Sequence, residues 1–167
     1  CQAVIDYAHR YAELAEQMAY QCQDPTRKQE LLQIASNCTR VPAKGARNFY
    51  EACQSFWFVQ QLIQMESSGH SISPGRFDQY MYPYYKSDME AGNLTREFAQ
   101  ELMDCIWVKL NDLNKCRDAA SAEGFAGYSL FQNLIVGGQD KYGNDVTNDL
   151  SVMCILASMH VHLPMPS

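Results

Sequence analysis

The residues best suited to chemistry stand together near the middle of the chain, in the run Gly-His-Ser-Ile-Ser-Pro-Gly that begins at Gly69. Glycine tolerates backbone angles that other residues resist, so Gly69 and Gly75 would let the backbone turn tightly and approach a ligand. His70, Ser71 and Ser73 would then present an imidazole and two hydroxyls to a substrate hydroxyl or carboxylate. The same spacing is typical of a helix end followed by a turn. Spacing alone favours the turn slightly and leaves the ligand site open.

This run belongs to a longer stretch, 66–85, that reads as a loop and that we interpret as the wall of a small-molecule site. Its second half also holds several tyrosines, namely Tyr80, Tyr82, Tyr84 and Tyr85. Amphipathic rings of this kind usually bury their faces and hydrogen-bond their hydroxyls. We therefore leave the tyrosines out of the candidate site.

Two phenylalanines, Phe125 and Phe131, form a second candidate. They stand in a segment, 125–138, whose aromatic and β-branched residues indicate a strand over part of its length. On an extended strand, residues of the same parity point to one face, so the two rings would line a shallow apolar slot. A plain core strand fits the same pattern, and spacing alone favours it.

Metal and nucleotide chemistry find little support in the sequence. Cys154, His160 and His162 could suggest a metal ion, but residues two apart at a helix end do not face each other. No Cys-x-x-Cys or His-Glu-x-x-His accompanies them, so we expect no metal site. The chain also lacks a P-loop, a dinucleotide-binding fingerprint and a Gly-x-Ser-x-Gly elbow.

Helices must position these groups. Apolar residues at helical spacing predict helices over 2–22, from Pro25 to just before Pro42, over 48–67, over 95–116, and from 147 or 148 to 160. Asp24 before Pro25, and Thr95, are typical helix caps. Asn48 with Glu51 three residues later resembles a capping box.

The composition indicates a globular domain and excludes several classes of protein. The 167 residues carry a formal charge of −6 and are 47% hydrophobic, which is too apolar for disorder. The basic residues are scattered, and no apolar run is long enough to span a bilayer. We therefore expect a cytoplasmic protein that binds neither nucleic acid nor membrane. The cysteines are expected to be reduced core residues. The chain begins at Cys1 and ends in Pro-Met-Pro-Ser, which we interpret as an internal piece of a longer protein.

Four blocks of the sequence resemble the glycyl radical enzymes of the pyruvate formate-lyase type. They are ESSGHSISPGRFDQYMYPYY (66–85), FAQELMDCIWVKLNDLNKCRD (98–118), FAGYSLFQNLIVGGQ (125–139) and residues 148–167. The resemblance implies the α/β fold of that family, a ten-stranded barrel wrapped in helices. Residues 1–167 would form one internal segment of it, without a separate second domain. This segment would be mostly helical with one or two barrel strands, one of them near 131–136.

The resemblance also implies where the chemistry begins. In such enzymes a glycyl radical oxidises an active-site cysteine, whose thiyl radical takes a hydrogen atom from the substrate. The Cys-x-Glu and Arg-Val-x-Gly-Tyr motifs that carry these two residues do not occur in this chain. We therefore expect no catalytic residue and no bound cofactor within it, and no activity from the chain alone. The expected partners are the remainder of the same polypeptide, a radical-SAM activating enzyme, a small-molecule substrate and a second copy in a homodimer, in an anaerobic bacterium.

The resemblance assigns substrate contacts to four positions. His70 and Ser71 resemble the pair that contacts substrate hydroxyls in glycerol and diol dehydratases, while Phe125 and Phe131 resemble two aromatic pocket residues of choline trimethylamine-lyase. Pyruvate formate-lyase itself has small apolar residues in place of the first pair and a tryptophan in place of Phe131, which argues against formate chemistry.

Three functions remain open, two of which follow from these positions. The two phenylalanines favour a C–N lyase of a choline-like substrate, because an aromatic slot suits an ammonium group and the amine leaves without needing a proton. The alternative is a glycerol or diol dehydratase, a C–O lyase in which His70 could protonate the departing hydroxyl. A reading of another class is a non-catalytic helical interaction domain, which would fold alone.

Overall fold

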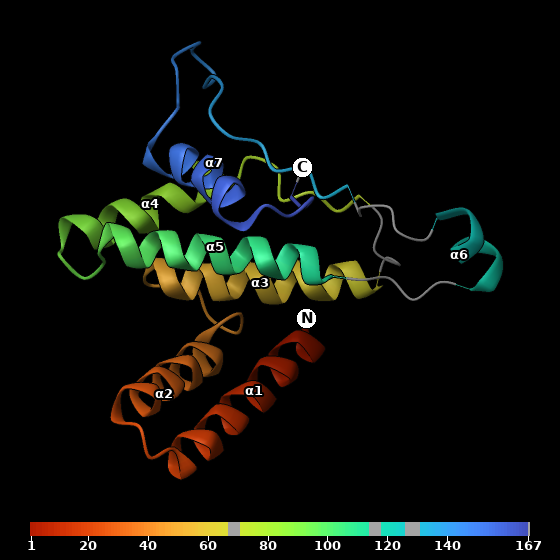
Figure 1. Ribbon diagram of the computed structural model, residues 1–167. Helices are drawn as coiled ribbons and strands as arrows, with labels where there is room; N and C mark the ends of the chain where they lie inside the picture. Colours follow the sequence, from red (N-terminus) through yellow and green to blue (C-terminus); the bar gives the residue numbers. More distant parts are fainter. Residues whose placement is uncertain (67–70, 114–117, 126–130, 167) are drawn as a thin grey trace. The chain divides into compact units, whose positions relative to one another are not determined.

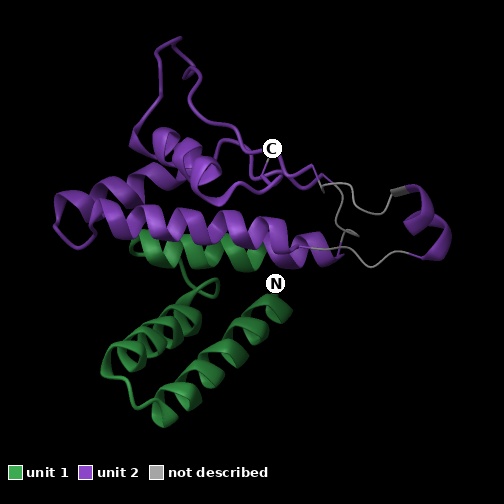
Figure 2. Cartoon of the chain, in the orientation of Figure 1, with its two compact units in different colours: residues 1–59 green, residues 60–167 purple. Residues whose placement is uncertain are grey.

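The computed structural model describes residues 1–66, 71–113, 118–125 and 131–166, except for the side chain of Phe125 (Figure 1). The chain is mostly α-helical and divides into two compact units, 1–59 and 60–167 (Figure 2). Within the described ranges, every helix is too short or too polar to traverse a bilayer.

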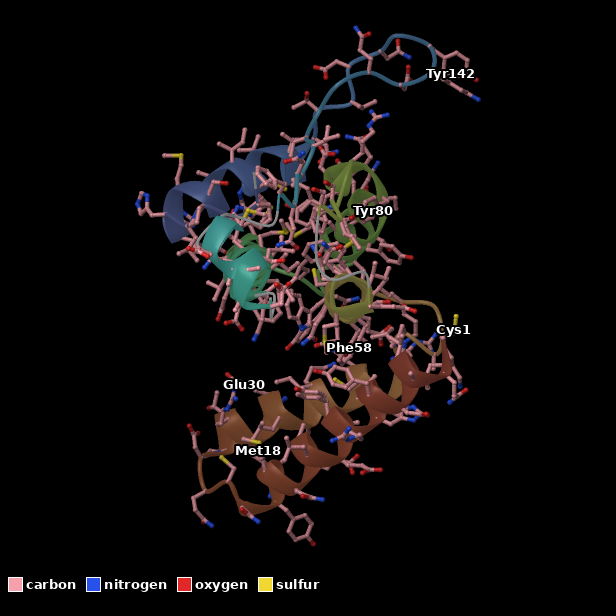
Figure 3. All side chains as sticks on the ribbon, turned by 90° about the vertical axis from the view of Figure 1, so that its right-hand side faces the viewer. Cys1, Met18, Glu30, Phe58, Tyr80 and Tyr142 are labelled. Carbon is pink, nitrogen blue, oxygen red and sulfur yellow. The ribbon has the colours of Figure 1, made fainter. Side chains whose placement is uncertain are left out.

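The first unit is built on a pair of helices that lie side by side, α1 (Gln2–Gln21) and α2 (Pro25–Arg40), followed by the start of α3 (Phe49–Glu66) (Figure 1). Small buried residues let helix backbones approach closely, and here they are Ala8, Ala12, Ala15, Ala19 and Ala35. Phe58 of α3, labelled in Figure 3, packs its ring against those of Tyr7 and Tyr11.

The predicted helix starts of this unit are confirmed, one of them without the full capping box. Asp24 Oδ1 accepts from Thr26 N–H at 2.9 Å, with Pro25 at the first helical position. Asn48 Oδ1 accepts from Glu51 N–H at 2.8 Å. The Glu51 carboxylate does not complete the capping box, because it accepts from the backbone and guanidinium of Arg47 instead.

The second unit contains four further helices within the described residues: α4 (Phe77–Glu90), α5 (Arg96–Asp112), α6 (Ala119–Phe125) and α7 (Asp149–Val161). Helices α4 and α5 both contact α7. Trp107 of α5 is buried and its indole Nε1–H donates to Ser158 Oγ of α7 at 2.8 Å. Thr95 caps α5 as predicted, and Asn148 caps α7 in a full capping box with Ser151.

Helix α4 corrects the prediction that 66–85 is a loop, since the loop ends at Arg76. The helix buries one stripe at helical spacing, Phe77, Met81, Tyr85 and Asp88. Pro83 lies inside α4, where it removes one backbone hydrogen bond, and such a proline usually marks a helix end. The apolar contacts of the buried stripe outweigh that loss.

The strand predicted within 125–138 is confirmed only at one point. Leu134 forms a parallel bridge with Gly75, and the described residues contain no longer ladder here. Phe125 is instead the last residue of α6, so the prediction that it shares one strand face with Phe131 is wrong. The reason is local: Asp118 accepts from Ser121 N–H and Ser121 Oγ–H, and the alanines that follow Asp118 favour a helix.

A second isolated bridge joins Gln139 to Asp145 in antiparallel fashion. It closes the turn predicted over 141–144, in which Asp140 Oδ1 accepts from Tyr142 N–H and Asn144 N–H. Tyr142 lies at the tip of this loop and is 76% exposed (Figure 3).

Candidate functional site

The candidate site is built on two short segments, 71–76 and 131–136, that pair in parallel. Gly75 N–H donates to Asn133 O at 3.3 Å and Ile135 N–H donates to Gly75 O at 2.8 Å. The Ser73 hydroxyl extends this pairing, because it accepts from Asn133 N–H at 3.1 Å and donates to Phe131 O at 3.4 Å. Gly75 has φ +68°, a conformation that glycine adopts without strain.

This pairing brings Ser71 and Phe131 to the same end of the two segments. Both residues are exposed, Phe131 by 46%. Both also have left-handed backbones, with φ 58° at Ser71 and 52° at Phe131. Side-chain-bearing residues rarely adopt this region, and where they do the surrounding structure must hold them there, often at a functional site. Of the predicted site residues, these two are therefore brought together.

The other two predicted site residues lie wholly or in part outside the described part of the structure. His70 lies outside the described residues. Phe125 ends α6, and its side chain also lies outside the described part of the structure. The assignments of His70 and Phe125 therefore remain predictions.

Sequence reasoning missed a set of buried glutamines behind the two segments. Gln60 and Gln64 of α3 both donate to Ile72 O, at 2.7 and 3.3 Å. Gln60 Nε2–H also donates to Gln132 Oε1 at 3.0 Å, and Gln132 Nε2–H donates to Leu110 O at 2.8 Å. Their only signal in the sequence is polar residues on the buried side of an otherwise apolar helix.

Asp78 anchors the other end of the 131–136 segment. It is fully buried, and its Oδ2 accepts from Gly137 N–H at 2.6 Å and from the Ser151 hydroxyl. Burial and the nearby Asp78 charge raise the pKa of Cys154 to about 12. Cys154 therefore stays a thiol at neutral pH and is not a nucleophile.

The histidines near the C-terminal end make other contacts. His160 Nδ1 lies 3.0 Å from Asp104 Oδ2, and His162 takes a left-handed conformation at the end of α7. No group of three potential metal ligands gathers among the residues that the structure describes.

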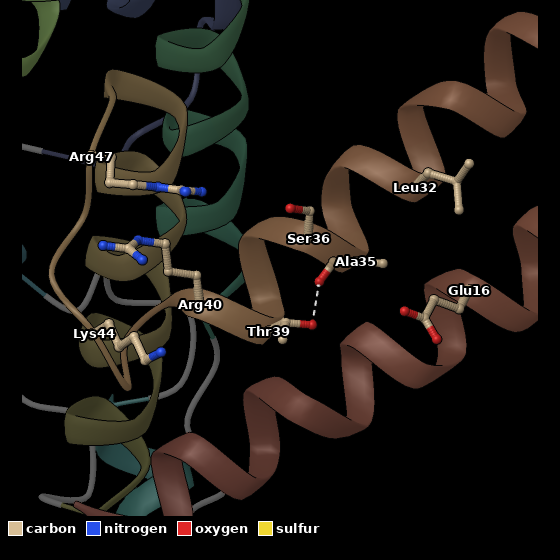
Figure 4. Close-up of a pocket in the computed structure, with 8 residues that line it drawn as sticks. All are labelled: Glu16, Leu32, Ala35, Ser36, Thr39, Arg40, Lys44 and Arg47. Atoms are coloured by element: carbon tan, nitrogen blue, oxygen red, sulfur yellow. Dashed lines mark hydrogen bonds between the residues drawn. The ribbon is translucent and has the colours of Figure 1, made fainter.

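A surface pocket of about 440 Å³ lies in the first unit, and none of the predicted site residues lines it (Figure 4). Three of its lining side chains are basic, Arg40, Lys44 and Arg47. Arg40 and Arg47 both form ion pairs with the buried carboxylate of Glu51. Their positive charges therefore stabilise that carboxylate in the first turn of α3.

Comparison with known proteins places the chain in a family. The family model described as pyruvate formate lyase-like matches residues 1–167. The chain belongs to the pyruvate formate lyase-like glycyl radical enzymes. The barrel fold predicted from the resemblance is confirmed by solved structures of this family, to which the chain corresponds as a mostly helical segment.

Two solved structures match the whole chain closely. One concerns 1,2-propanediol dehydration in Roseburia inulinivorans and is 73% identical, with a TM-score of 0.95. The other is the glycerol-bound B12-independent glycerol dehydratase from Clostridium butyricum, which is 56% identical, with a TM-score of 0.93. The chain covers 20% and 21% of their lengths.

A more distant relative is a lyase of a different bond. The isethionate sulfite-lyase of Desulfovibrio desulfuricans is 41% identical over 99% of this chain, and the match covers 20% of that protein. The chain thus spans about a fifth of the length of the relatives it matches, whose names describe dehydratases and a sulfite-lyase.

Proposed function

We propose that the protein to which this chain belongs is a glycyl radical dehydratase of small vicinal diols, and that the chain forms part of its substrate wall. The observation that carries this proposal is the 73% identity, over the whole chain, to the Roseburia inulinivorans protein concerned with 1,2-propanediol dehydration. The C–N lyase that the two phenylalanines first favoured finds no counterpart among the relatives above, whereas the alternative, a C–O lyase, does.

The proposed reaction is redox-neutral. A hydrogen atom leaves C1 of the diol and returns to C2 of the product, while the C2–O bond breaks and the hydroxyl departs as water. The C1 hydroxyl loses its proton and becomes the carbonyl, so 1,2-propanediol gives propanal and glycerol gives 3-hydroxypropanal. A hydroxyl leaves readily only when it gains a proton, so the site needs a general acid and donors that orient both hydroxyls.

The residues of this chain would supply binding and orientation. Ser71, exposed at the end of the paired segments, would hydrogen-bond a substrate hydroxyl. His70 would protonate the leaving hydroxyl, and the rings of Phe125 and Phe131 would bound the apolar side of the pocket. We propose these four roles from the resemblance of their positions to the family.

Hydrogen-atom abstraction would be supplied by a cysteine thiyl and a glycyl radical, whose motifs these residues do not contain. We also propose that a radical-SAM enzyme installs the radical, and that the protein acts as a homodimer in the cytoplasm of an anaerobic bacterium. Residues 1–167 would be one segment of its barrel domain.

The test is product formation by the full-length protein, activated anaerobically by its radical-SAM partner. We expect 1,2-propanediol to yield propanal in an amount equal to the diol consumed, measured by coupled reduction with alcohol dehydrogenase and NADH. Omission of the activating enzyme is the control. An activated protein with a glycyl radical visible by electron paramagnetic resonance, but with no aldehyde from either 1,2-propanediol or glycerol, would refute the proposal.

A further inference from the structure

A buried pair of amides, Gln60 and Gln132, joins the two segments of the candidate site from behind. Gln60 is 6% exposed and Gln132 is fully buried. Gln60 Nε2 uses both of its hydrogens, one to Ile72 O at 2.7 Å and one to Gln132 Oε1 at 3.0 Å. One side chain of α3 therefore contacts both segments at once.

Gln132 fixes this pair to a third element. Its Nε2–H donates to Leu110 O at 2.8 Å, and α5 ends at Asp112. The last four carbonyls of a helix lack the partners that mid-helix carbonyls have, and Gln132 donates to one of them. The amide pair is thus held in position by α3 and α5 together.

The amide pair holds the chain one residue after each of the two left-handed residues, Ser71 and Phe131. Ile72, whose carbonyl Gln60 binds, follows Ser71, and Gln132 follows Phe131. A left-handed backbone is unfavourable for an L-residue, and such residues persist where the surrounding structure holds the chain on either side. Gln60 holds the chain at Ile72 O, and the side-chain bonds of Gln132 hold the chain directly after Phe131, while both amides are themselves buried.

We infer that Gln60 and Gln132 are positioning residues that fix the distance between Ser71 and Phe131, and so determine which diols, and which enantiomer of a diol, are accepted. This inference rests on the proposed function, because it takes Ser71 as the residue that holds a hydroxyl and Phe131 as the wall that the substrate's carbon chain meets. The distance between Ser71 and Phe131 would set the room for the substrate's carbon chain, and a pocket can separate substrates that differ by one methyl group.

Two variants of the full-length, activated protein test this role. Gln132→Leu removes the bonds to Gln60 and Leu110 at similar volume. Gln60→Met removes the hydrogen bonds of Gln60 to both segments, while Gln64 of the same helix still donates to Ile72 O. The readout is kcat and KM for (R)- and (S)-1,2-propanediol and for glycerol.

We expect each variant to raise KM more than it lowers kcat, and to change the ratio of kcat/KM between the two enantiomers by about fivefold or more. A purely structural role predicts a different result. Loss of folded protein would lower kcat for both enantiomers by one factor and leave both KM values and their ratio unchanged.

Gln100→Leu is the matched control. Gln100 also donates its amide to a backbone carbonyl of another helix, that of Met153 at 3.1 Å, and its other hydrogen bond within the described residues goes to Asp104, not to 71–76 or 131–136. The Gln100→Leu variant should keep the wild-type ratio of kcat/KM between the two enantiomers.

The inference is overturned if Gln60→Met, or Gln132→Leu where it folds, keeps the wild-type KM values and ratio, or if Gln100→Leu shifts the ratio equally. Should Gln132→Leu fail to accumulate, Gln60→Met decides alone, because Ile72 O keeps its bond from Gln64. A wild-type enzyme that dehydrates none of the three diols is a separate result, which refutes the proposed function.

Discussion

At the scale of single residues, the candidate site depends on side chains that stand on strained backbone. Ser71 has φ 58° and Phe131 has φ 52°, and both are exposed at the same end of the paired segments. A left-handed residue also ends α7 at His162, so the backbone alone does not decide between a turn and a ligand contact. The role of Ser71 in substrate binding stays a prediction.

Ser71 offers the most direct test at this scale. We expect Ser71→Ala to lower kcat/KM for the diol about 10–100-fold, because a hydrogen bond that orients the substrate hydroxyl is lost. Ser71→Gly separates this from backbone effects, since glycine adopts φ 58° without strain but lacks the hydroxyl.

Steady-state kinetics of both variants decide the matter, with Ser87→Ala on the exposed side of α4 as control. Equal losses in the alanine and glycine variants implicate the hydroxyl. Wild-type activity in Ser71→Gly would remove the Ser71 hydroxyl from the site.

Glu51 gives a prediction on pH. Burial alone would raise its pKa, but hydrogen bonds from Arg47 and the charges of Arg47 and Arg40 lower it below the usual 4.5. A lowered folded-state pKa means that the carboxylate stabilises the fold above the unfolded pKa, and that this contribution is lost as the pH falls through the folded value.

Glu51→Gln should therefore lower amide hydrogen-exchange protection at the start of α3 in the full-length protein at pH 7, by about 1.5–3 kcal/mol. The difference from wild type should shrink once the pH falls below about 4. A difference that is the same at pH 7 and at low pH would contradict the role of the charge.

At the scale of elements, the sequence predicted what depends on near neighbours. The caps at Asp24 and Thr95 and the helices that they begin follow from residues within one turn, and the structure confirms them. Helix α4 was missed because Pro83 indicates a break, whereas the helix persists through burial of Phe77, Met81 and Tyr85.

In the candidate site, too, local patterns are visible in the sequence whereas long-range contacts are not. Ser71 is a candidate on the sequence alone because the run of glycines, histidine and serines around it is local. The bond between Gln60 and Gln132 joins residues 72 apart in sequence, so no local pattern could predict it. Phe125 was placed on the wrong kind of element because its aromatic neighbours indicate a strand, while the capped turn at Asp118 starts a helix.

The turn at Gly137 should be the least tolerant of the glycine positions near the site. Its φ is +64°, and an added Cβ would lie 2.9 Å from Thr147 Oγ1, which is itself held by a bond to Asp145. Gly75 has φ +68° with nothing within 4 Å of an added Cβ. We expect Gly75→Ala to cost about 1–2 kcal/mol from the backbone alone, and Gly137→Ala to cost more.

Thermal unfolding of the full-length protein ranks these variants, with Gly45→Ala as control because its φ is not positive and its surroundings are open. We expect Gly45→Ala to have the highest melting temperature of the three variants, Gly75→Ala a lower one and Gly137→Ala the lowest. Equal melting temperatures for the last two would show that Thr147 moves aside freely.

At the scale of the whole molecule, the chain is a mostly helical segment of a glycyl radical enzyme barrel, and it spans about a fifth of its relatives. Its paired segments meet in a single parallel bridge, which fits a part whose sheet partners lie elsewhere in the fold. The family match covers the entire chain and gives no support to the alternative of an independent, non-catalytic interaction domain.

The central claim is that the site cleaves C–O and not C–N bonds. The most direct measurement is a competition in which the activated full-length protein receives equal concentrations of 1,2-propanediol and choline, with products followed by mass spectrometry. The account predicts propanal, and trimethylamine no higher than in the sample without activating enzyme. Trimethylamine as the main product would contradict it.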